Sequence, residues 1–336
     1  MKTMKKAAAL LLVLSLVLAL GACGQEKAQD QALEEITLVL DWTPNTNHTG
    51  IYVAQEKGYF AENGLNVTVV QPPEDGAALL VSSGRAQFGI SFQDSMAPAL
   101  TGDSPLDITA VAAILQHNTS GIVSRKGEGM DRPKGLEGHK YATWDMAVEK
   151  ATLKQVVEKD GGDFSKVELI PSTVTDEVSA LQSKSVDAIW IFYGWAGIAC
   201  ETAQLPIDYF AFKDMDPVFD FYTPVVIANN AFLKDQPETA KKVMDALSKG
   251  YTYAAENPEE AAQILIKASP ELKDSEDLVV ASQKSLAKEY VADAERWGQI
   301  DPERWGGFFT WLNENGLTES PLDPAAGFTN DYLPEK

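Results

Sequence analysis

The sequence from Ile36 to Phe60 reads ITLVLDWTPNTNHTGIYVAQEKGYF, and it divides into three parts. Ile36–Leu40 is an apolar, β-branched run typical of a buried strand, and Ile51–Phe60 carries apolar residues at helical spacing. Between them, Asp41–Gly50 places a tryptophan, a histidine and two asparagines in one short connection. A plain solvated loop rarely combines these residues, so we expect this strand-to-helix connection to form part of a binding site.

The same alternation of strand and helix continues along the first two thirds of the chain. Strand-like runs follow at NVTVVQP, AQFGIS and DITAVAAIL, and a second series contains KYAT, VELIP, DAIWIF and YTPVVIA. Helices are predicted between these runs, among them residues 148–159 and 176–183. Because a parallel crossover needs a dozen or more residues, this order predicts an α/β fold with mostly parallel sheets covered by helices.

From Ala231 on, the sequence is helical. Two groups of residues follow the spacing of one helix face: Ala240, Val243, Met244 and Leu247, and then Trp305, Phe308, Phe309 and Leu312. We interpret both faces as core packing, and the simplest topology returns this tail to the first part of the chain. The predicted organisation is therefore a discontinuous first domain (36–118 and 230–336), an inserted second domain (119–229) and two crossing strands as the hinge. A ligand cleft would lie between the domains, at the carboxyl ends of both sheets.

The first 35 residues are typical of an exported, membrane-attached protein. Three lysines precede the apolar stretch Ala7–Leu20, which is too short to be a convincing membrane-spanning helix, so residues 1–22 are predicted to be a signal peptide. The small residues before Cys23 resemble a lipobox, which predicts lipidation of Cys23. The polar segment 23–35 is then a tether on the extracytoplasmic face of the cell membrane.

Composition and residue counts exclude several classes of function. The formal net charge of −21 argues against nucleic acid and against a basic surface for anionic lipid. Cys200 is the one cysteine besides Cys23, so the mature chain has no intrachain disulfide, and we expect Cys200 to be a buried apolar residue. The histidines show no metal-ligand spacing, although a His48/His117 metal pair stays an alternative. No cofactor is predicted.

The predicted loops share a composition in which an aromatic ring stands beside amides, hydroxyls or a carboxylate. From these loops we predict ten ligand contacts: Trp42, Asn45, His48, Gln93, Asp94, Asn118, Trp144, Tyr193, Trp195 and Tyr222. Trp42 and Trp195 would stack on the ligand, and the polar residues would bind its edge. Asp94, Asp145 and Asp220 either accept from an exocyclic amine or cap a helix. Few lysines or arginines occur here, which favours a small, flat, polar-edged molecule over a sulfonate, nitrate or phosphate.

Three stretches carry a resemblance to a known family: Leu40–Phe60, SSGRAQFGIS (82–91) and PEEAAQIL (258–265). At these stretches the chain resembles substrate-binding proteins of ABC importers in the thiamine-pyrimidine-synthase-like family, relatives of the alkanesulfonate binders. The resemblance implies a type II periplasmic-binding-protein-like clamshell, a monomer that delivers its ligand to a membrane permease. By its opening motif the chain is most similar to binders of formylaminopyrimidine or hydroxymethylpyrimidine, which are precursors of thiamine.

The same family contains an enzyme, the eukaryotic pyrimidine synthase. It resembles this chain but holds its cofactor on a lysine and consumes a histidine four residues later, where this chain has Ser91 and Ser95. Its cysteine-rich segment corresponds to PVFDFYT (217–223), which has no cysteine. Because no Schiff base forms without an amine, we predict a binding protein and not an enzyme.

A second departure concerns the ligand. Pyrimidine-binding relatives carry a glutamate shortly after the tyrosine of the segment that matches IFYGWAG (191–197), where this chain has Gly197. Riboflavin or another aromatic heterocycle therefore stays an alternative to a pyrimidine.

Overall fold

The computed structural model describes residues 32–335. The predicted signal peptide (1–22), the predicted lipidation site Cys23 and most of the tether lie outside the described residues. A compact unit begins at Glu35 and contains the sheets and helices that follow. Within residues 32–335, no helix combines the length and apolar character needed to cross a bilayer.

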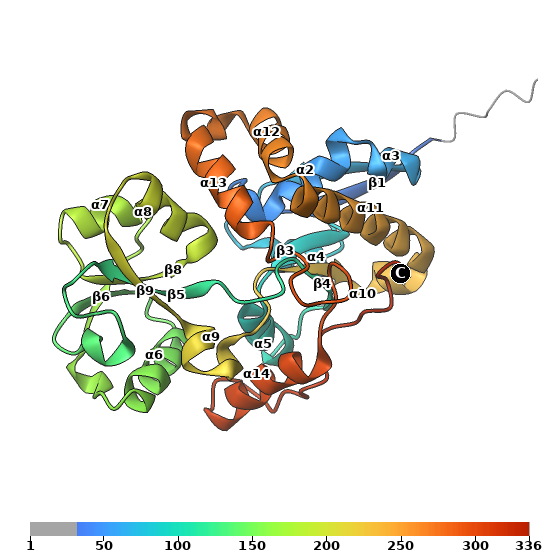
Figure 1. Ribbon diagram of the computed structural model, residues 1–336. Helices are drawn as coiled ribbons and strands as arrows, with labels where there is room; N and C mark the ends of the chain where they lie inside the picture. The colour runs from blue at the N-terminus through green and yellow to red at the C-terminus, as the bar shows by residue number, and fades with distance from the viewer. Residues whose placement is uncertain (1–31, 336) are drawn as a thin grey trace, which may run out of the picture. The chain divides into compact units, whose positions relative to one another are not determined.

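Two sheets of five strands each form the framework of the described chain. The first sheet has the order β2 (Leu65–Val70), β1 (Glu34–Val39), β3 (Phe88–Ser91), β10 (Val225–Asn229) and β4 (Ile108–Ala113). The second has the order β7 (Glu168–Pro171), β6 (Lys140–Thr143), β8 (Ala188–Phe192), β5 (Ser120–Arg125) and β9 (Ile207–Ala211). Figure 1 shows the strands of the second sheet gathered in a lobe of their own, so the predicted two-lobed α/β fold is confirmed.

Both sheets are mixed, because each contains a strand that runs against its neighbours. In the first sheet β1 pairs with β3 in parallel, whereas β10 is antiparallel to β3 and β4. In the second sheet β6 is parallel to β7 and β8, whereas β5 is antiparallel to β8 and β9. The chain enters β5 from the first sheet through residues 114–119, and it enters β10 from the second sheet through residues 212–224. Because neither strand is reached by a crossover from a strand of its own sheet, each can run antiparallel to its neighbours.

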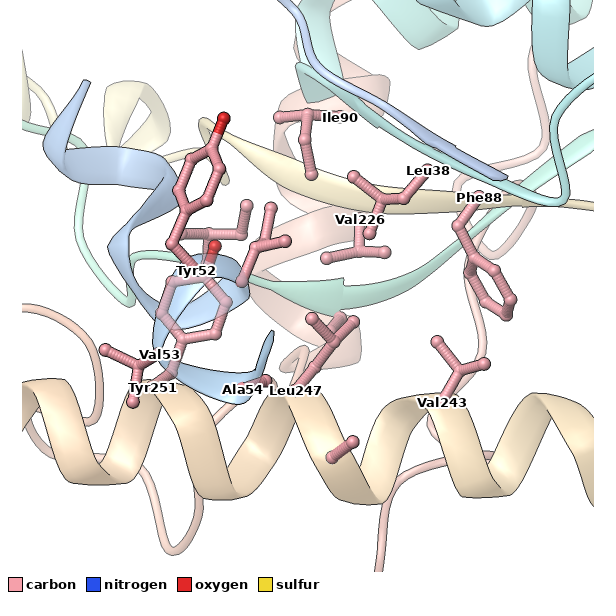
Figure 2. Packing of buried hydrophobic residues seen from close by; sticks show 14 of the residues in the cluster. Leu38, Tyr52, Val53, Ala54, Phe88, Ile90, Val226, Val243, Leu247 and Tyr251 are labelled. Carbon is pink, nitrogen blue, oxygen red and sulfur yellow. The ribbon is translucent and has the colours of Figure 1, made fainter. Parts of the chain in front are cut away.

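The first sheet is covered by helices that are distant in sequence. Figure 2 shows Val243 and Leu247 of α11 (Pro237–Glu256) pointing towards α2 (Thr49–Glu56) and the sheet. The whole predicted face of Ala240, Val243, Met244 and Leu247 is buried, which confirms it as core. The two helices approach closely at Gly250, where a Cβ would lie 2.1 Å from the carbonyl oxygen of Gly50. Any larger residue at this crossing would push α11 away from α2.

The last helix, α14 (Pro302–Glu314), also follows its sequence signals. The Asp301 carboxylate caps it by accepting from the backbone N–H of Glu303 at 2.7 Å, and Gly316 follows the helix with a φ of 64°. The predicted aromatic stripe is buried, namely Trp305, Phe308, Phe309 and Leu312.

The remaining helices connect the strands or cover the sheets. They are α3 (Tyr59–Glu62), α4 (Ala77–Ser82), α5 (Gln93–Thr101), α6 (Ala147–Lys159), α7 (Glu177–Gln182), α8 (Ile198–Thr202), α9 (Phe212–Met215), α10 (Asn230–Asp235), α12 (Pro258–Ala268) and α13 (Glu276–Leu286). Cys200 in α8 is fully buried, as predicted, and burial raises the pKa of its thiol to about 11.

Candidate functional site

The loops that follow five strands meet at a cavity of about 480 Å³. Its wall contains residues of the loop after β1, Phe92 after β3 and Trp144 after β6. It also contains Thr173, Val174, Thr175 and Glu177 after β7, and Phe192, Gly194 and Trp195 at the end of β8. Residues from both sheets therefore face the same space. A volume of this size, at the carboxyl ends of strands, is typical of a small-molecule site.

Aromatic side chains form much of the cavity wall. Trp42 is 62% exposed, Trp144 is 41% exposed and Phe192 is 37% exposed, although all three are large and apolar. The rings of Phe92 and Phe192 come from different sheets, and they stack with centroids 6.5 Å apart and an angle of 18° between planes. Rings from both lobes are thus presented to the cavity, and a planar molecule placed between them would bury them.

The loop after β1 is fixed from within by a buried histidine. Asn45 caps the 3₁₀ turn Thr46–His48 (η1), and its side chain accepts from the Asn47 backbone N–H at 2.9 Å. The Nδ1 atom of His48 accepts from the Asn45 backbone N–H at 3.2 Å, and Nε2 lies 2.6 Å from Asp41 Oδ1. Since Nδ1 is an acceptor, the ring proton belongs on Nε2, which donates to the Asp41 carboxylate. His48 is fully buried, so it positions the loop that carries Trp42.

Gln93 and Tyr222 hold the start of α5 against the segment that leads into β10. The amide nitrogen of Gln93 donates to the carbonyl oxygen of Trp305 at 2.8 Å, and its oxygen accepts from the Tyr222 backbone N–H at 2.9 Å. The hydroxyl oxygen of Tyr222 accepts from the Asp301 backbone N–H at 2.9 Å, and burial raises the pKa of this phenol. Both side chains are almost fully buried, and neither lines the cavity.

Asn118 links the two segments that pass between the sheets. Its amide nitrogen donates to the Phe219 carbonyl oxygen at 2.8 Å, and its oxygen accepts from the Ser120 backbone N–H at 2.8 Å. Beside it, Asp220 accepts from the Asn118 backbone N–H at 2.9 Å and lies 2.7 Å from His117 Nδ1. Asn118 is fully buried and lies outside the cavity lining, and both partners of its side chain are backbone groups.

Two further predicted residues lie near the cavity loops but outside the lining. Asp94 is half-buried in the first turn of α5, accepts from the Ser95 backbone N–H at 2.9 Å, and has its pKa raised to about 6 by desolvation. Tyr193 is hydrogen-bonded to Glu201, and its ring centroid lies 4.7 Å from that of Tyr209. Burial, together with Glu201, raises the pKa of Tyr193 to about 12. Tyr193 and Glu201 line a separate hollow.

Of the ten predicted contacts, the structure brings four together in the cavity wall: Trp42, Asn45, Trp144 and Trp195. It places the other six outside that wall: His48, Gln93, Asp94, Asn118, Tyr193 and Tyr222. The acceptors considered beside Asp94 are paired, since Asp145 is bound to Lys150 and Asp220 faces His117.

The cavity wall also contains residues that sequence reasoning missed. Thr173, Val174, Thr175 and Glu177 follow the predicted strand VELIP, so their position at a strand end was a usable signal. Leu272 and Leu286 come from the helical tail, where nothing in the sequence separates a cavity-lining leucine from a core leucine.

The charge of the lining is acidic. Asp41 and Glu177 contribute carboxylates, and no lysine or arginine lines the cavity in the described part of the chain. The lining therefore offers acceptors to a ligand and no basic side chain for an anion.

The two histidines considered as a metal pair have different partners. His48 binds Asp41, whereas the Nδ1 and Nε2 atoms of His117 face Asp220 and Asp293 at 2.7 and 3.1 Å. Because the two acids lie at opposite ring nitrogens, they do not converge on one point. Residues 32–335 contain no group of three or more potential ligands suited to a metal ion.

Residues 45–261 match the NMT1/THI5-like family. The chain belongs to this family. The NMT1/THI5-like chain is 28% identical to a formylaminopyrimidine-binding protein of Halalkalibacterium halodurans, over 95% of its own length and 98% of that protein. It is also 26% identical to a 4-amino-5-hydroxymethyl-2-methylpyrimidine phosphate synthase of Saccharomyces cerevisiae, over 89% and 88% of the two chains.

Solved structures with the same fold include binding proteins. The aliphatic sulphonate binding protein SsuA of Escherichia coli superposes with a TM-score of 0.67 at 15% identity, covering 90% of this chain and 94% of SsuA. This match shows that the NMT1/THI5-like chain has the two-lobed periplasmic-binding-protein fold. The family match over residues 45–261 confirms the resemblance first drawn from Leu40–Phe60.

Proposed function

We propose that the protein is the extracytoplasmic solute-binding component of an ABC importer and captures a small planar heterocycle. The first candidate ligand is a thiamine pyrimidine precursor, formylaminopyrimidine or hydroxymethylpyrimidine. The observation that carries the proposal is the cavity with exposed rings from both lobes, Trp42 on one side and Trp144 and Phe192 on the other. The similarity to a formylaminopyrimidine-binding protein supports the choice of a pyrimidine.

Binding is proposed to proceed by closure of the two lobes. Trp42, Asn45, Trp144 and Trp195 are the proposed direct contacts, and stacking on each ring contributes about 0.5–1.5 kcal/mol beyond area burial. Of the six predicted residues outside the wall, His48, Gln93, Asn118 and Tyr222 hold the loops and the crossings in place. The ligand makes some of its contacts only in the closed form, and these contacts shift the population towards that form.

A synthase activity is the rival from another class, because a synthase is among the relatives. Ser91 and Ser95 stand where the resemblance to the synthase places the cofactor lysine and the consumed histidine. Neither hydroxyl forms a Schiff base, and no lysine lines the cavity within the described residues. We therefore propose binding and delivery without chemistry on the ligand.

The proposed partners follow from the same role. The protein would be anchored through lipid on Cys23 at the outer face of the cell membrane, act as a monomer and dock on permease subunits. Mass spectrometry of the exported chain tests the anchor, because lipidation leaves a diacylglyceryl group on Cys23 as the new amino-terminal residue.

A thermal-shift and calorimetry screen tests the proposal. The probes are formylaminopyrimidine, hydroxymethylpyrimidine, thiamine, riboflavin and an alkanesulfonate. A ligand at a hundred times its Kd adds about 2.7 kcal/mol to the free energy of unfolding, which is easily measured. Stabilisation by a pyrimidine supports the first candidate, and stabilisation by riboflavin alone selects the alternative. Stabilisation by the sulfonate alone, or by no probe, contradicts the proposal.

A further inference from the structure

Glu177 is the cavity carboxylate that has no side-chain partner among residues 32–335. Asp41, the other acid in the lining of the described chain, is bound to His48 at 2.6 Å. Within residues 32–335, the Glu177 carboxylate forms no ion pair and no hydrogen bond with another residue. The two acids of the cavity therefore differ. The Asp41 carboxylate is bound within the protein, whereas the Glu177 carboxylate is available to a ligand.

The structural role that an acid would have at this position is already filled. Glu177 is the first residue of α7, where acids often stabilise a helix by capping it. Here the preceding residue, Asp176, is the cap, and its carboxylate accepts from the Ser179 backbone N–H at 2.9 Å and from the Ser179 hydroxyl at 2.6 Å. Glu177 is therefore not the cap of α7.

The surroundings of Glu177 favour a ligand that brings hydrogen-bond donors. The side chain is half-buried, and desolvation raises its pKa above the ordinary range, with a further contribution from the charge of Asp176. The same cavity presents the rings of Trp42 and Trp195 and contains no basic side chain in its described lining. An N–H group that arrives with the ligand would offset the loss of water around the carboxylate.

We propose that Glu177 determines specificity by accepting hydrogen bonds from an amino group on the edge of a ring held between the aromatic walls. The site then selects amine-bearing heterocycles over their oxo counterparts, because a ring carbonyl would place an oxygen against the carboxylate. This inference rests on the proposed function, which supplies the planar heterocycle, and adds the chemistry of its edge.

Calorimetry with the full chain and two matched probes tests the inference. The probes are 4-amino-5-hydroxymethyl-2-methylpyrimidine and its 4-oxo counterpart. The wild-type chain is expected to prefer the amino probe by about tenfold or more, since a hydrogen bond to a charged group is lost with the oxo probe. Glu177→Gln is expected to weaken binding of the amino probe by about tenfold and to bring the preference close to one.

A matched control and a second variant keep the test decisive. Glu168→Gln removes the same charge from an exposed position of β7 outside the cavity, and is expected to change neither affinity. Glu177→Asp keeps the carboxylate and is expected to retain a preference for the amino probe, with a melting temperature close to that of the wild type.

The outcomes separate this inference from the proposed function. A preference that survives Glu177→Gln, or a wild-type chain that binds the oxo probe or riboflavin as tightly as the amino probe, overturns the inference and leaves the proposed function standing. A wild-type chain that binds neither of the two matched probes and does not bind riboflavin contradicts both.

Discussion

Two regions of the molecule use polar and apolar residues in opposite ways. One is the frame, by which we mean the buried residues, among them Gln93 and Asn118, that hold the two segments passing between the sheets. The other is the wall of the cavity. In the frame, Gln93 and Asn118 are fully buried, and their amides bind backbone groups that are distant in sequence. In the wall, Trp42 and Trp144 are large and apolar but exposed. A buried polar group with partners stabilises one geometry, whereas an exposed ring gains its contacts when a ligand arrives. The frame should therefore control stability, and the wall should control affinity.

The largest expected effect on stability comes from replacing a tryptophan of the core. Replacing a tryptophan of the cavity wall should have a much smaller effect. Trp305 is fully buried and donates from Nε1 to the Ala326 carbonyl oxygen at 2.9 Å. Trp305→Ala should lower the free energy of unfolding by about 3–5 kcal/mol, because it leaves a large cavity. Trp42→Ala should lower it by no more than about 0.5 kcal/mol, since Trp42 is exposed. Urea unfolding measures both, and equal losses would erase the distinction between frame and wall.

A polar residue of the frame should have the next largest effect on stability. Asn118→Ala leaves the Ser120 N–H and the Phe219 carbonyl without their side-chain partner. Each unsatisfied buried group costs about 1–3 kcal/mol, so we expect a loss of about 2–4 kcal/mol in urea unfolding. The matched control, Asn66→Ala, removes an exposed asparagine that binds Glu35, and should have little effect. A loss no greater than that of the control would show that Asn118 does not hold the crossings.

Substitutions in the cavity wall should change the affinity for the ligand. Trp42→Ala is expected to weaken binding of the best heterocycle from the ligand screen by about ten- to a hundredfold, since stacking and burial together contribute about 1.5–3 kcal/mol. Trp42→Phe should recover part of this loss because it restores an aromatic face. Leu79→Ala, at another exposed apolar position outside the cavity lining, is the control in calorimetry. Unchanged affinity in Trp42→Ala would remove Trp42 from the site.

Asp94 sharpens the comparison, because it is polar and half-buried but bound only by the adjacent backbone. Its pKa of about 6 in the folded chain lies above the ordinary value of 3.8, so the folded state binds its proton more tightly than the unfolded state does. The contribution of Asp94 to the stability of the wild type should therefore fall as the pH rises from about 4 to about 6. Asp94→Asn should remove this contribution and be about 1–2 kcal/mol more stable at pH 7. Parallel stability curves for the two proteins in urea would contradict this prediction.

The sequence predicts the fold well because hydrophobic periodicity records burial directly. The apolar face of α11 and the stripe of α14 were identified from spacing alone, and both are buried. The direction of β5 and β10 was not predictable in this way, because an apolar strand looks the same whether it runs parallel or antiparallel to its neighbour.

The candidate site was harder to predict, and there is a physical reason why six of the ten predicted contacts lie outside the cavity wall. Trp42 and Trp195 line the cavity, whereas the rings of Tyr193 and Tyr222 lie outside it and have partners within the protein. An amide in the same position either binds a ligand or binds backbone, and Gln93 and Asn118 have backbone partners more than a hundred residues away. Sequence spacing does not contain that information. Glu177 was missed because its loop lacks an aromatic residue, although its position after a strand was recognisable.

Hydroxyl-radical footprinting of the full chain, with and without the best heterocycle from the screen, tests most directly whether the lobes close on a planar ligand. Mass spectrometry reads each aromatic residue separately, and the buried Trp297 and Trp305 serve as internal controls. We predict that the ligand protects Trp42 and Trp144 together, while the two buried tryptophans do not change. Protection of one lobe alone, or of neither, at a saturating ligand concentration would contradict closure around a ligand held between the two walls.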